Sequence, residues 1–172
     1  DRSAAICQFC DTDFRGTDGE NGGKYTAKEL ADKVAEQWEA GMNKGTPYVV
    51  CTGGEPLLQL DGKMVKAFHE KGIEVAIETN GTKLPPEGID WICMSPKAGA
   101  DLVLEKGSEL KLVFPQLGAE PELFEDLDYE HFYLQPMDGP NTEKNIQLAI
   151  KYCLQNPKWR LSLQTHKMIN IP

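Results

Sequence analysis

Several features are missing from this sequence, and each absence argues against a class of protein. No stretch approaches the roughly 18 consecutive apolar residues of a membrane-spanning helix, and no signal-peptide pattern is visible. Acidic residues outnumber basic ones by 27 to 18, which gives a formal charge of −9. Because phosphate backbones repel an acidic chain, we expect no nucleic-acid partner. The missing apolar run leads us to expect no membrane partner.

A regular disulfide framework is also missing. The chain has five cysteines, an odd number without even spacing, so we expect it in the reducing cytoplasm. With 172 residues, no linker and no internal repeat, residues 1–172 are expected to form one domain. The chain begins at Asp1 without a strand before its first cysteines, so we expect that domain to lack an N-terminal segment.

One short motif near the start can bind a soft metal. Cys7 and Cys10 are three residues apart, which lets two thiolates meet at one centre. By itself this spacing serves zinc sites, redox disulfides and iron–sulfur clusters equally well. The remaining cysteines (Cys51, Cys93 and Cys153) lie in apolar segments and are expected to be core residues.

Apolar periodicity predicts alternating strands and helices. Helices are expected after Thr26, after Asp61 and after Thr142, with a weaker acidic helix around residues 120–127. The final helix is expected to bury an apolar face that includes Leu154. The expected strands are residues 48–52, 73–77, 91–94, 109–114, 131–134 and 161–163.

This order of elements predicts an α/β fold with a largely parallel sheet and right-handed crossovers. Six strands are too few for a closed eightfold barrel, so an open or partial (β/α) barrel is expected. Polar motifs follow the apolar strands, and the carboxyl ends of parallel strands are where such sheets build their sites.

Six of these motifs occur in one order, from Cys7 to the C-terminus. They are Cys-Gln-Phe-Cys-Asp-Thr-Asp-Phe, Cys-Thr-Gly-Gly-Glu-Pro, Ile-Glu-Thr-Asn-Gly, Ser-Pro-Lys, Leu-Gln-Pro-Met-Asp-Gly and Gln-Thr-His-Lys. The cysteine loop and the Gly-Gly-Glu-Pro turn resemble the radical S-adenosylmethionine (radical SAM) superfamily. The full set resembles the family of 7-carboxy-7-deazaguanine synthases. That resemblance implies a partial (β/α) barrel of the radical SAM type, with its first strand missing from this chain.

The resemblance also implies a reaction and its cofactors. Members of this family convert 6-carboxy-5,6,7,8-tetrahydropterin to 7-carboxy-7-deazaguanine with loss of ammonia, in queuosine biosynthesis. Cys7 and Cys10 would be ligands of a [4Fe–4S] cluster, and the third cysteine that the family requires would lie upstream of Asp1. Thr12 would bind Mg²⁺, which also takes the substrate carboxylate.

Further residues are implied to bind the two organic molecules. The substrate would contact Thr52, His166 and Pro172. The Gly-Gly-Glu-Pro turn would offer backbone acceptors to the amino group of SAM. SAM is implied to contact Phe9, Cys10, Asp11, Gly54, Glu78, Asn80, Ser95, Pro96, Lys97, Gln135, Pro136, Met137 and Asp138. From the residues alone, Glu78 and Asn80 can also form a simple turn, since Asn-Gly is a strong turn signal.

The resemblance further implies a homodimer and an electron donor such as a flavodoxin. Two other functions stay open. A radical SAM activating enzyme that acts on a protein partner would share Cys7, Cys10 and the Gly-Gly-Glu-Pro turn. A non-enzymatic zinc-binding module would need further cysteine or histidine ligands in pairs.

Overall fold

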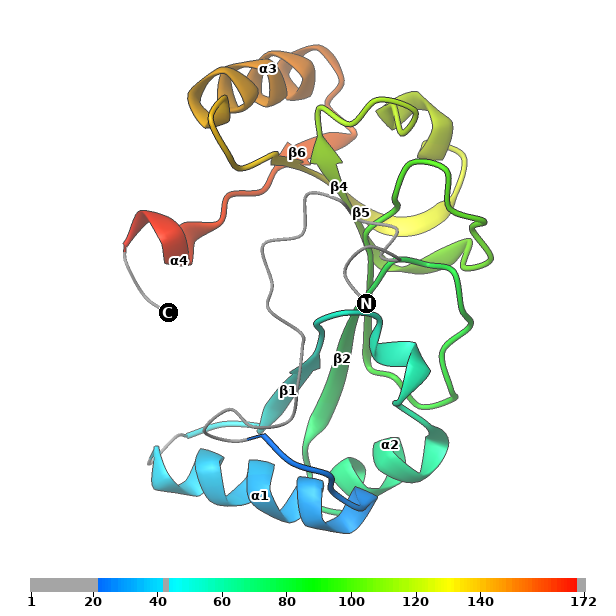
Figure 1. Ribbon diagram of the computed structural model, residues 1–172, viewed down its shortest axis with the longest axis vertical. Coiled ribbons are helices and arrows are strands. Elements are labelled where there is room, and N and C mark those ends of the chain that lie inside the picture. The colour runs from blue at the N-terminus through cyan, green and yellow to red at the C-terminus, as the bar shows by residue number, and fades with distance from the viewer. Residues whose placement is uncertain (1–21, 42–43, 170–172) are drawn as a thin grey trace. The chain divides into compact units, whose positions relative to one another are not determined.

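The computed structural model describes residues 22–41 and 44–169 (Figure 1). The contacts among them divide the chain into two compact units. The first unit contains the described residues up to Thr79 together with Lys83–Ile92. The second contains Asn80–Thr82 together with the described residues from Cys93 onward. Each unit has helices and buried apolar residues of its own.

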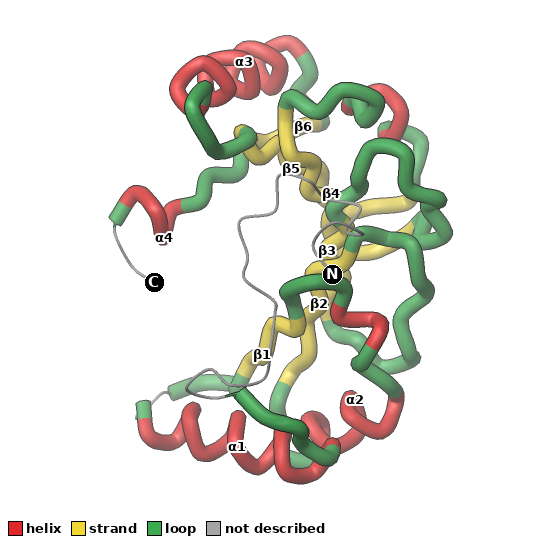
Figure 2. The backbone as a smooth tube through the Cα atoms, in the orientation of Figure 1, coloured by secondary structure: helices red, strands yellow, loops and turns green. Residues whose placement is uncertain are grey.

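In the described part of the chain, six strands form one sheet in the order β1 to β6. Every register determined within it is parallel: β1 with β2, β3 with β4, β4 with β5, and β5 with β6. The parallel α/β class expected from the sequence is confirmed. Figure 2 shows the loops that follow the strands. The strands are β1 Tyr48–Cys51, β2 Glu74–Thr79, β3 Trp91–Met94, β4 Lys106–Phe114, β5 Asp128–Pro136 and β6 Trp159–Leu161.

In the first unit, α1 (Ala27–Ala40) and α2 (Gly62–His69) lie together beside β1 and β2 (Figure 1). The predicted capping box at Thr26 and the predicted cap at Asp61 are both confirmed. Such caps stabilise a helix by about 1 kcal/mol each, because they satisfy N–H groups that have no partner in the helix. Phe68 from α2 packs with buried residues of the neighbouring segments, which fixes both helices against the strands.

In the second unit, α3 (Thr142–Gln155) packs on β5 and β6. Trp159 in β6 is 2% exposed, and its ring centroid lies 5.3 Å from that of Phe132 in an edge-to-face arrangement. Such aromatic pairs contribute about 0.5–1.5 kcal/mol beyond the area that they bury. This contact anchors the short last strand.

Some sequence-based details of the second unit are wrong. Thr142 is the first residue of α3, and the N-cap position belongs to Asn141. Leu154 is 80% exposed, and the apolar face centres on Ala149 instead. The last strand is Trp159–Leu161, because the buried Trp159 pairs with Phe132, whereas the expected strand residue Leu163 is exposed.

Three short helical segments complete the described elements. They are η2 (Pro56–Leu58), η3 (Pro121–Phe124) and α4 (Thr165–Met168). The acidic helix expected around residues 120–127 is only the short 3₁₀ turn η3. Leu123 in this turn is exposed, so the segment has no continuous apolar face that would stabilise a longer helix.

Among the described residues, no helix has the length and apolar character needed to cross a membrane.

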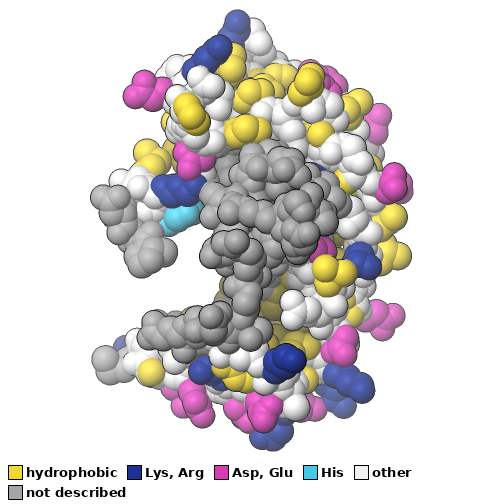
Figure 3. Space-filling model, in the orientation of Figure 1, with side chains coloured by type: hydrophobic (Ala, Val, Ile, Leu, Met, Phe, Trp, Pro, Cys, Tyr) yellow, Lys and Arg dark blue, Asp and Glu magenta, His cyan; other side chains and the backbone are white. Residues whose placement is uncertain are grey.

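Acidic and basic side chains both occur on the face drawn in Figure 3. Several basic groups are neutralised by pairing within one unit, as Lys28 and Asp32 are in α1 at 2.7 Å.

Candidate active site

The loop after β1 contains two consecutive glycines in left-handed backbone conformations. Gly53 has φ 77° and Gly54 has φ 51°. Side chains with a Cβ rarely adopt these angles, so glycine is needed at both positions. Thr52 and Gly54 are exposed. The loop therefore presents its backbone to solvent at the carboxyl end of β1, where a ligand can approach closely.

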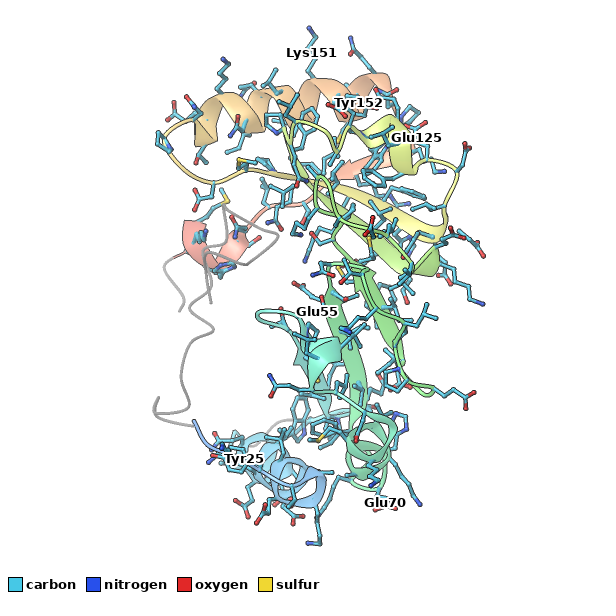
Figure 4. The ribbon with its side chains drawn as sticks, turned by 45° about the vertical axis from the view of Figure 1, so that its right-hand side comes forward. Tyr25, Glu55, Glu70, Glu125, Lys151 and Tyr152 are labelled. Atoms are coloured by element: carbon cyan, nitrogen blue, oxygen red, sulfur yellow. The ribbon has the colours of Figure 1, made fainter. Side chains whose placement is uncertain are left out.

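Glu55 fixes this loop to the neighbouring strand. Its Oε1 accepts a hydrogen bond from the N–H of Leu57 at 3.1 Å and another from the hydroxyl of Thr79 at 2.7 Å. Thr79 is the last residue of β2 and is 2% exposed. Figure 4 labels Glu55 in the loop that follows β1. The Gly-Gly-Glu-Pro turn and the Glu-Thr-Asn motif are thus joined by a hydrogen bond inside the first unit.

Beyond the end of β2 the chain makes a tight turn. The Oδ1 of Asn80 accepts from the N–H of Thr82 at 3.0 Å and from its hydroxyl at 2.7 Å. Gly81 has φ 80°, and a Cβ there would lie 2.5 Å from a methyl carbon of Leu102. The turn that Asn-Gly predicts is therefore confirmed. Glu78, which precedes it in β2, is half-buried.

The segment after β3 is held by a buried amide. Lys97 donates from Nζ to the carbonyl and the hydroxyl of Ser95, both at 2.7 Å. Gln116, which follows β4 and is 8% exposed, accepts from the N–H of Ala98 at 3.0 Å and donates to the carbonyl of Pro96 at 3.3 Å. Gln116 thus fixes the backbone on both sides of Lys97, so the ammonium group has a defined place at this strand end.

Gln135 and Pro136 end β5, and two bonds hold the residue that follows them. The N–H of Met137 donates to the carbonyl of Phe114 at 2.7 Å. The side-chain amide of Asn145 in α3 donates to the carbonyl of Met137 at 2.8 Å, and Asn145 is 8% exposed. The loop after β5 is therefore attached both to β4 and to α3.

Asp138 follows in the same loop and carries an ion pair. Its Oδ2 accepts from Nζ of Lys167 in α4 at 2.6 Å. Its Oδ1 accepts from the hydroxyl of Thr142 and from the N–H of Gly139, each at 2.9 Å. The hydrogen bonds from Lys167 and then Thr142 lower the pKa of the Asp138 carboxyl below its ordinary value. Through Lys167 the loop also holds α4, where the exposed His166 lies.

Several predicted site residues lie outside the described residues. They are Cys7, Phe9, Cys10, Asp11, Thr12 and Pro172. Within residues 22–41 and 44–169, no three His, Cys, Asp or Glu side chains are placed to hold a metal ion. That part of the chain therefore supplies no zinc site of its own.

The three described cysteines are thiols that form no disulfide. Cys93 is buried, as expected for a core residue, whereas Cys51 and Cys153 are half-buried. Burial raises the pKa of the Cys51 and Cys153 thiols, which favours their protonated form and disfavours metal binding.

Comparison with known proteins places these features in a family. The model of the Radical SAM superfamily matches residues 4–156. The chain is 59% identical to the 7-carboxy-7-deazaguanine synthase of Caulobacter vibrioides and 60% identical to that of Bordetella pertussis, over 100% of this chain and 81% of each relative. This chain belongs to the 7-carboxy-7-deazaguanine synthase family of the radical SAM superfamily.

A solved structure agrees with this assignment. The crystal structure of QueE from Escherichia coli is similar with a TM-score of 0.65 and 26% identity, over 81% of this chain and 64% of that chain. The agreement of fold supports the parallel sheet described above. In this 7-carboxy-7-deazaguanine synthase family member, each described site residue predicted from the sequence lies at or just beyond the carboxyl end of a strand, or in α4.

The residues that hold these loops were not among the predicted site residues. Thr79, Gln116, Asn145 and Lys167 each bond to a strand-end loop. The sequence held one weak signal for them. A polar residue within an apolar pattern is often buried, and a buried polar side chain needs a hydrogen-bond partner. Thr79 and Asn145 both fit that description, but spacing could not identify their partners.

Proposed function

We propose that this protein converts 6-carboxy-5,6,7,8-tetrahydropterin to 7-carboxy-7-deazaguanine and ammonia, on the route to queuosine and other 7-deazapurines. The conversion balances, since the product and one ammonia together contain all atoms of the pterin. One observation carries the proposal: the relatives at 59% and 60% identity over the whole chain bear the name 7-carboxy-7-deazaguanine synthase.

The donor chemistry of the chain fits the cofactors of a radical SAM enzyme. Cys7 and Cys10 offer two thiolates, the ligands that iron–sulfur clusters use, and we assign them to a [4Fe–4S] cluster. When bound, the reduced cluster supplies the electron that cleaves SAM, and SAM supplies the radical that starts the rearrangement. The left-handed Gly53 and Gly54 fit the close approach that a backbone contact to SAM requires.

We assign the other SAM contacts to loops whose positions are locally fixed. Ser95, Pro96 and Lys97 follow β3, and the buried amide of Gln116 holds them. Other predicted SAM contacts lie in the last residues of β2 and β5 or just after these strands. The remaining contacts belong to the cysteine motif near the start of the chain. These further SAM contacts are Phe9, Cys10, Asp11, Glu78, Asn80, Gln135, Pro136, Met137 and Asp138.

We assign substrate binding to Thr52, His166 and Pro172. Thr52 follows β1 directly and is exposed, so its hydroxyl is available at a strand end. His166 is exposed in α4, which Lys167 attaches to the loop after β5. Thr12 would bind Mg²⁺ through its hydroxyl, and the ion would orient the substrate carboxylate. A hard oxygen donor with retained waters suits that ion.

The proposal extends to the partners of the enzyme. The reaction needs an external one-electron donor, for which a flavodoxin is the candidate, and we propose a homodimer in the cytoplasm. We also propose that residues 1–172 act as one catalytic domain although their contacts form two compact units.

Complementation tests the function in a cell. A bacterial strain that lacks its own 7-carboxy-7-deazaguanine synthase receives the complete gene, and queuosine in its tRNA is quantified by mass spectrometry. We expect restored queuosine with the unchanged gene and none with Cys10→Ala, which removes a cluster ligand. Expression of soluble protein without any queuosine would overturn the proposal.

A further inference from the structure

We propose that Thr79 is a positioning residue for SAM binding, because its hydroxyl holds Glu55 and thereby fixes the backbone of Gly53 and Gly54. This inference rests on the proposed function, in which that backbone contacts SAM. It assigns a role to a residue that ends the neighbouring strand and does not itself belong to the loop.

The hydrogen bond joins two adjacent strand ends. Cys51, the last residue of β1, lies in register with Ile77 of β2, so Thr79 extends beside the loop that leaves β1. The bond from its hydroxyl to Oε1 of Glu55 is 2.7 Å long. A short bond to a carboxylate oxygen is of the charge-assisted kind, which is about twice as strong as a bond between neutral groups.

The choice of threonine at this position supports a role for the hydroxyl. Thr79 is 2% exposed. Val75, Ala76 and Ile77 of β2 are also buried, and only the half-buried Glu78 stands between them and Thr79. Valine has almost the same shape, prefers strands as strongly, and would bring no polar atom into a buried place. We therefore infer that the hydroxyl is needed for its hydrogen bond to Glu55.

The same carboxylate oxygen also accepts from the N–H of Leu57 at the start of η2. Glu55 therefore holds its own loop on one side and β2 on the other. Without the hydroxyl of Thr79, the bond that caps η2 remains, but the hydrogen bond between Glu55 and β2 is lost. The two glycines before Glu55 then have more backbone freedom, which SAM must remove when it binds.

The test compares two matched pairs, the unchanged protein with Thr79→Val and Thr79→Ser with Thr79→Ala. Each protein is expressed from the complete gene and reconstituted anaerobically with iron and sulfide. Thr79→Val replaces the hydroxyl by a methyl group of similar size. Thr79→Ser and Thr79→Ala differ from each other only by the hydroxyl. The readouts are the Kd for SAM by equilibrium dialysis, the KM values for SAM and for the pterin, iron content, and the melting temperature.

We expect Thr79→Val to raise the Kd and the KM for SAM about tenfold, with the KM for the pterin within about twofold of the unchanged protein. Thr79→Ser should stay close to the unchanged protein, and Thr79→Ala should follow Thr79→Val. A purely structural role would lower the melting temperature without separating the two KM values, and that result would overturn the inference.

Two further outcomes are also decisive. If Thr79→Val and Thr79→Ala both fail to fold while Thr79→Ser folds, the hydroxyl is needed for folding and the positioning role is wrong. If the unchanged protein binds SAM but forms no 7-carboxy-7-deazaguanine, the proposed function fails on its own. The effect of Thr79 on SAM binding is still decided by dialysis in that case.

Discussion

The loops after β1 and after β5 are both held at strand ends, but by different chemistry. Glu55 in the first loop bonds to Thr79, which is 2% exposed. Asp138 in the second bonds to Lys167, and the two side chains are 46% and 35% exposed. A buried hydrogen bond to a carboxylate keeps its strength in salt, whereas an exposed ion pair is screened. The hydrogen bond in the first unit should therefore be insensitive to salt, whereas the ion pair in the second should weaken as salt is added.

The second loop also has a buried attachment of its own. Asn145 is 8% exposed and donates to the carbonyl of Met137 at 2.8 Å. The exposed ion pair then has a narrower task, which is to hold α4. In each unit, therefore, a buried polar side chain positions the loop backbone, and in the second unit the exposed Asp138–Lys167 ion pair adds a contact that solvent can weaken.

The largest effect is expected from breaking the buried anchor at Glu55. Glu55→Leu removes the carboxylate that accepts from Leu57 and from Thr79, so both of these hydrogen bonds are lost. We expect kcat/KM for SAM to fall about a hundredfold. Glu55→Gln keeps an acceptor oxygen of similar reach and should lose no more than about tenfold. Equal losses in the two variants would show that the hydrogen bonds do not matter.

A smaller loss, of stability, is expected at Asn145. Asn145→Ala leaves the carbonyl of Met137 without this donor and should lower the free energy of unfolding by about 1–3 kcal/mol. Asn141→Ala is the matched control, because Asn141 is exposed and makes no side-chain capping bond to α3. Urea unfolding measures both. A control variant as unstable as Asn145→Ala would contradict the buried role of Asn145.

Removing the exposed ion pair should have a modest, salt-dependent effect. Lys167→Met keeps most of the aliphatic side chain but loses the bond to Asp138. We expect the KM for the pterin to rise about threefold at low ionic strength, because α4 carries His166, and the difference should vanish near 1 M salt. Steady-state assays at two salt concentrations measure it. A loss that persists in high salt would contradict screening.

The smallest effect concerns pH. The pKa of Asp138 is lowered from its ordinary value of 3.8, chiefly by Lys167 and then by Thr142. A lowered carboxyl pKa stabilises the fold at pH values above the ordinary value, and that contribution is lost as the pH falls through the lowered pKa. The stability difference between the unchanged protein and Asp138→Asn should therefore be present at neutral pH and shrink as the pH falls below the ordinary pKa of 3.8. A difference that does not change with pH would contradict this assignment.

The sequence predicted the elements better than the contacts between them. The helix at Ala27–Ala40 was found because the capping box of Thr26 and Glu29 is a local pattern. The strand Trp91–Met94 was found because four apolar residues stand between turn signals. Both depend on neighbours in the chain, which a sequence displays directly.

Contacts between distant residues could not be predicted in this way. Thr79 lies 24 residues from Glu55, and Lys167 lies 29 residues from Asp138. The contact between Thr79 and Glu55 depends on strand register, and the contact between Lys167 and Asp138 depends on where α4 begins. The spacing of apolar residues in the sequence predicts neither. Leu154 was wrongly placed in the core because its spacing fits the helix, whereas the apolar face of α3 is narrower and Asn145 occupies a buried position.

The most direct test of the function is the identity of the product formed by the anaerobically reconstituted protein. The protein from the complete gene is incubated with 6-carboxy-5,6,7,8-tetrahydropterin, SAM, Mg²⁺ and a reductant, and the products are resolved by liquid chromatography and mass spectrometry. We predict 7-carboxy-7-deazaguanine and one ammonia for each pterin consumed, only when SAM is present. Recovery of unchanged pterin while SAM is cleaved, or protein that holds zinc without iron and sulfide, would contradict the account.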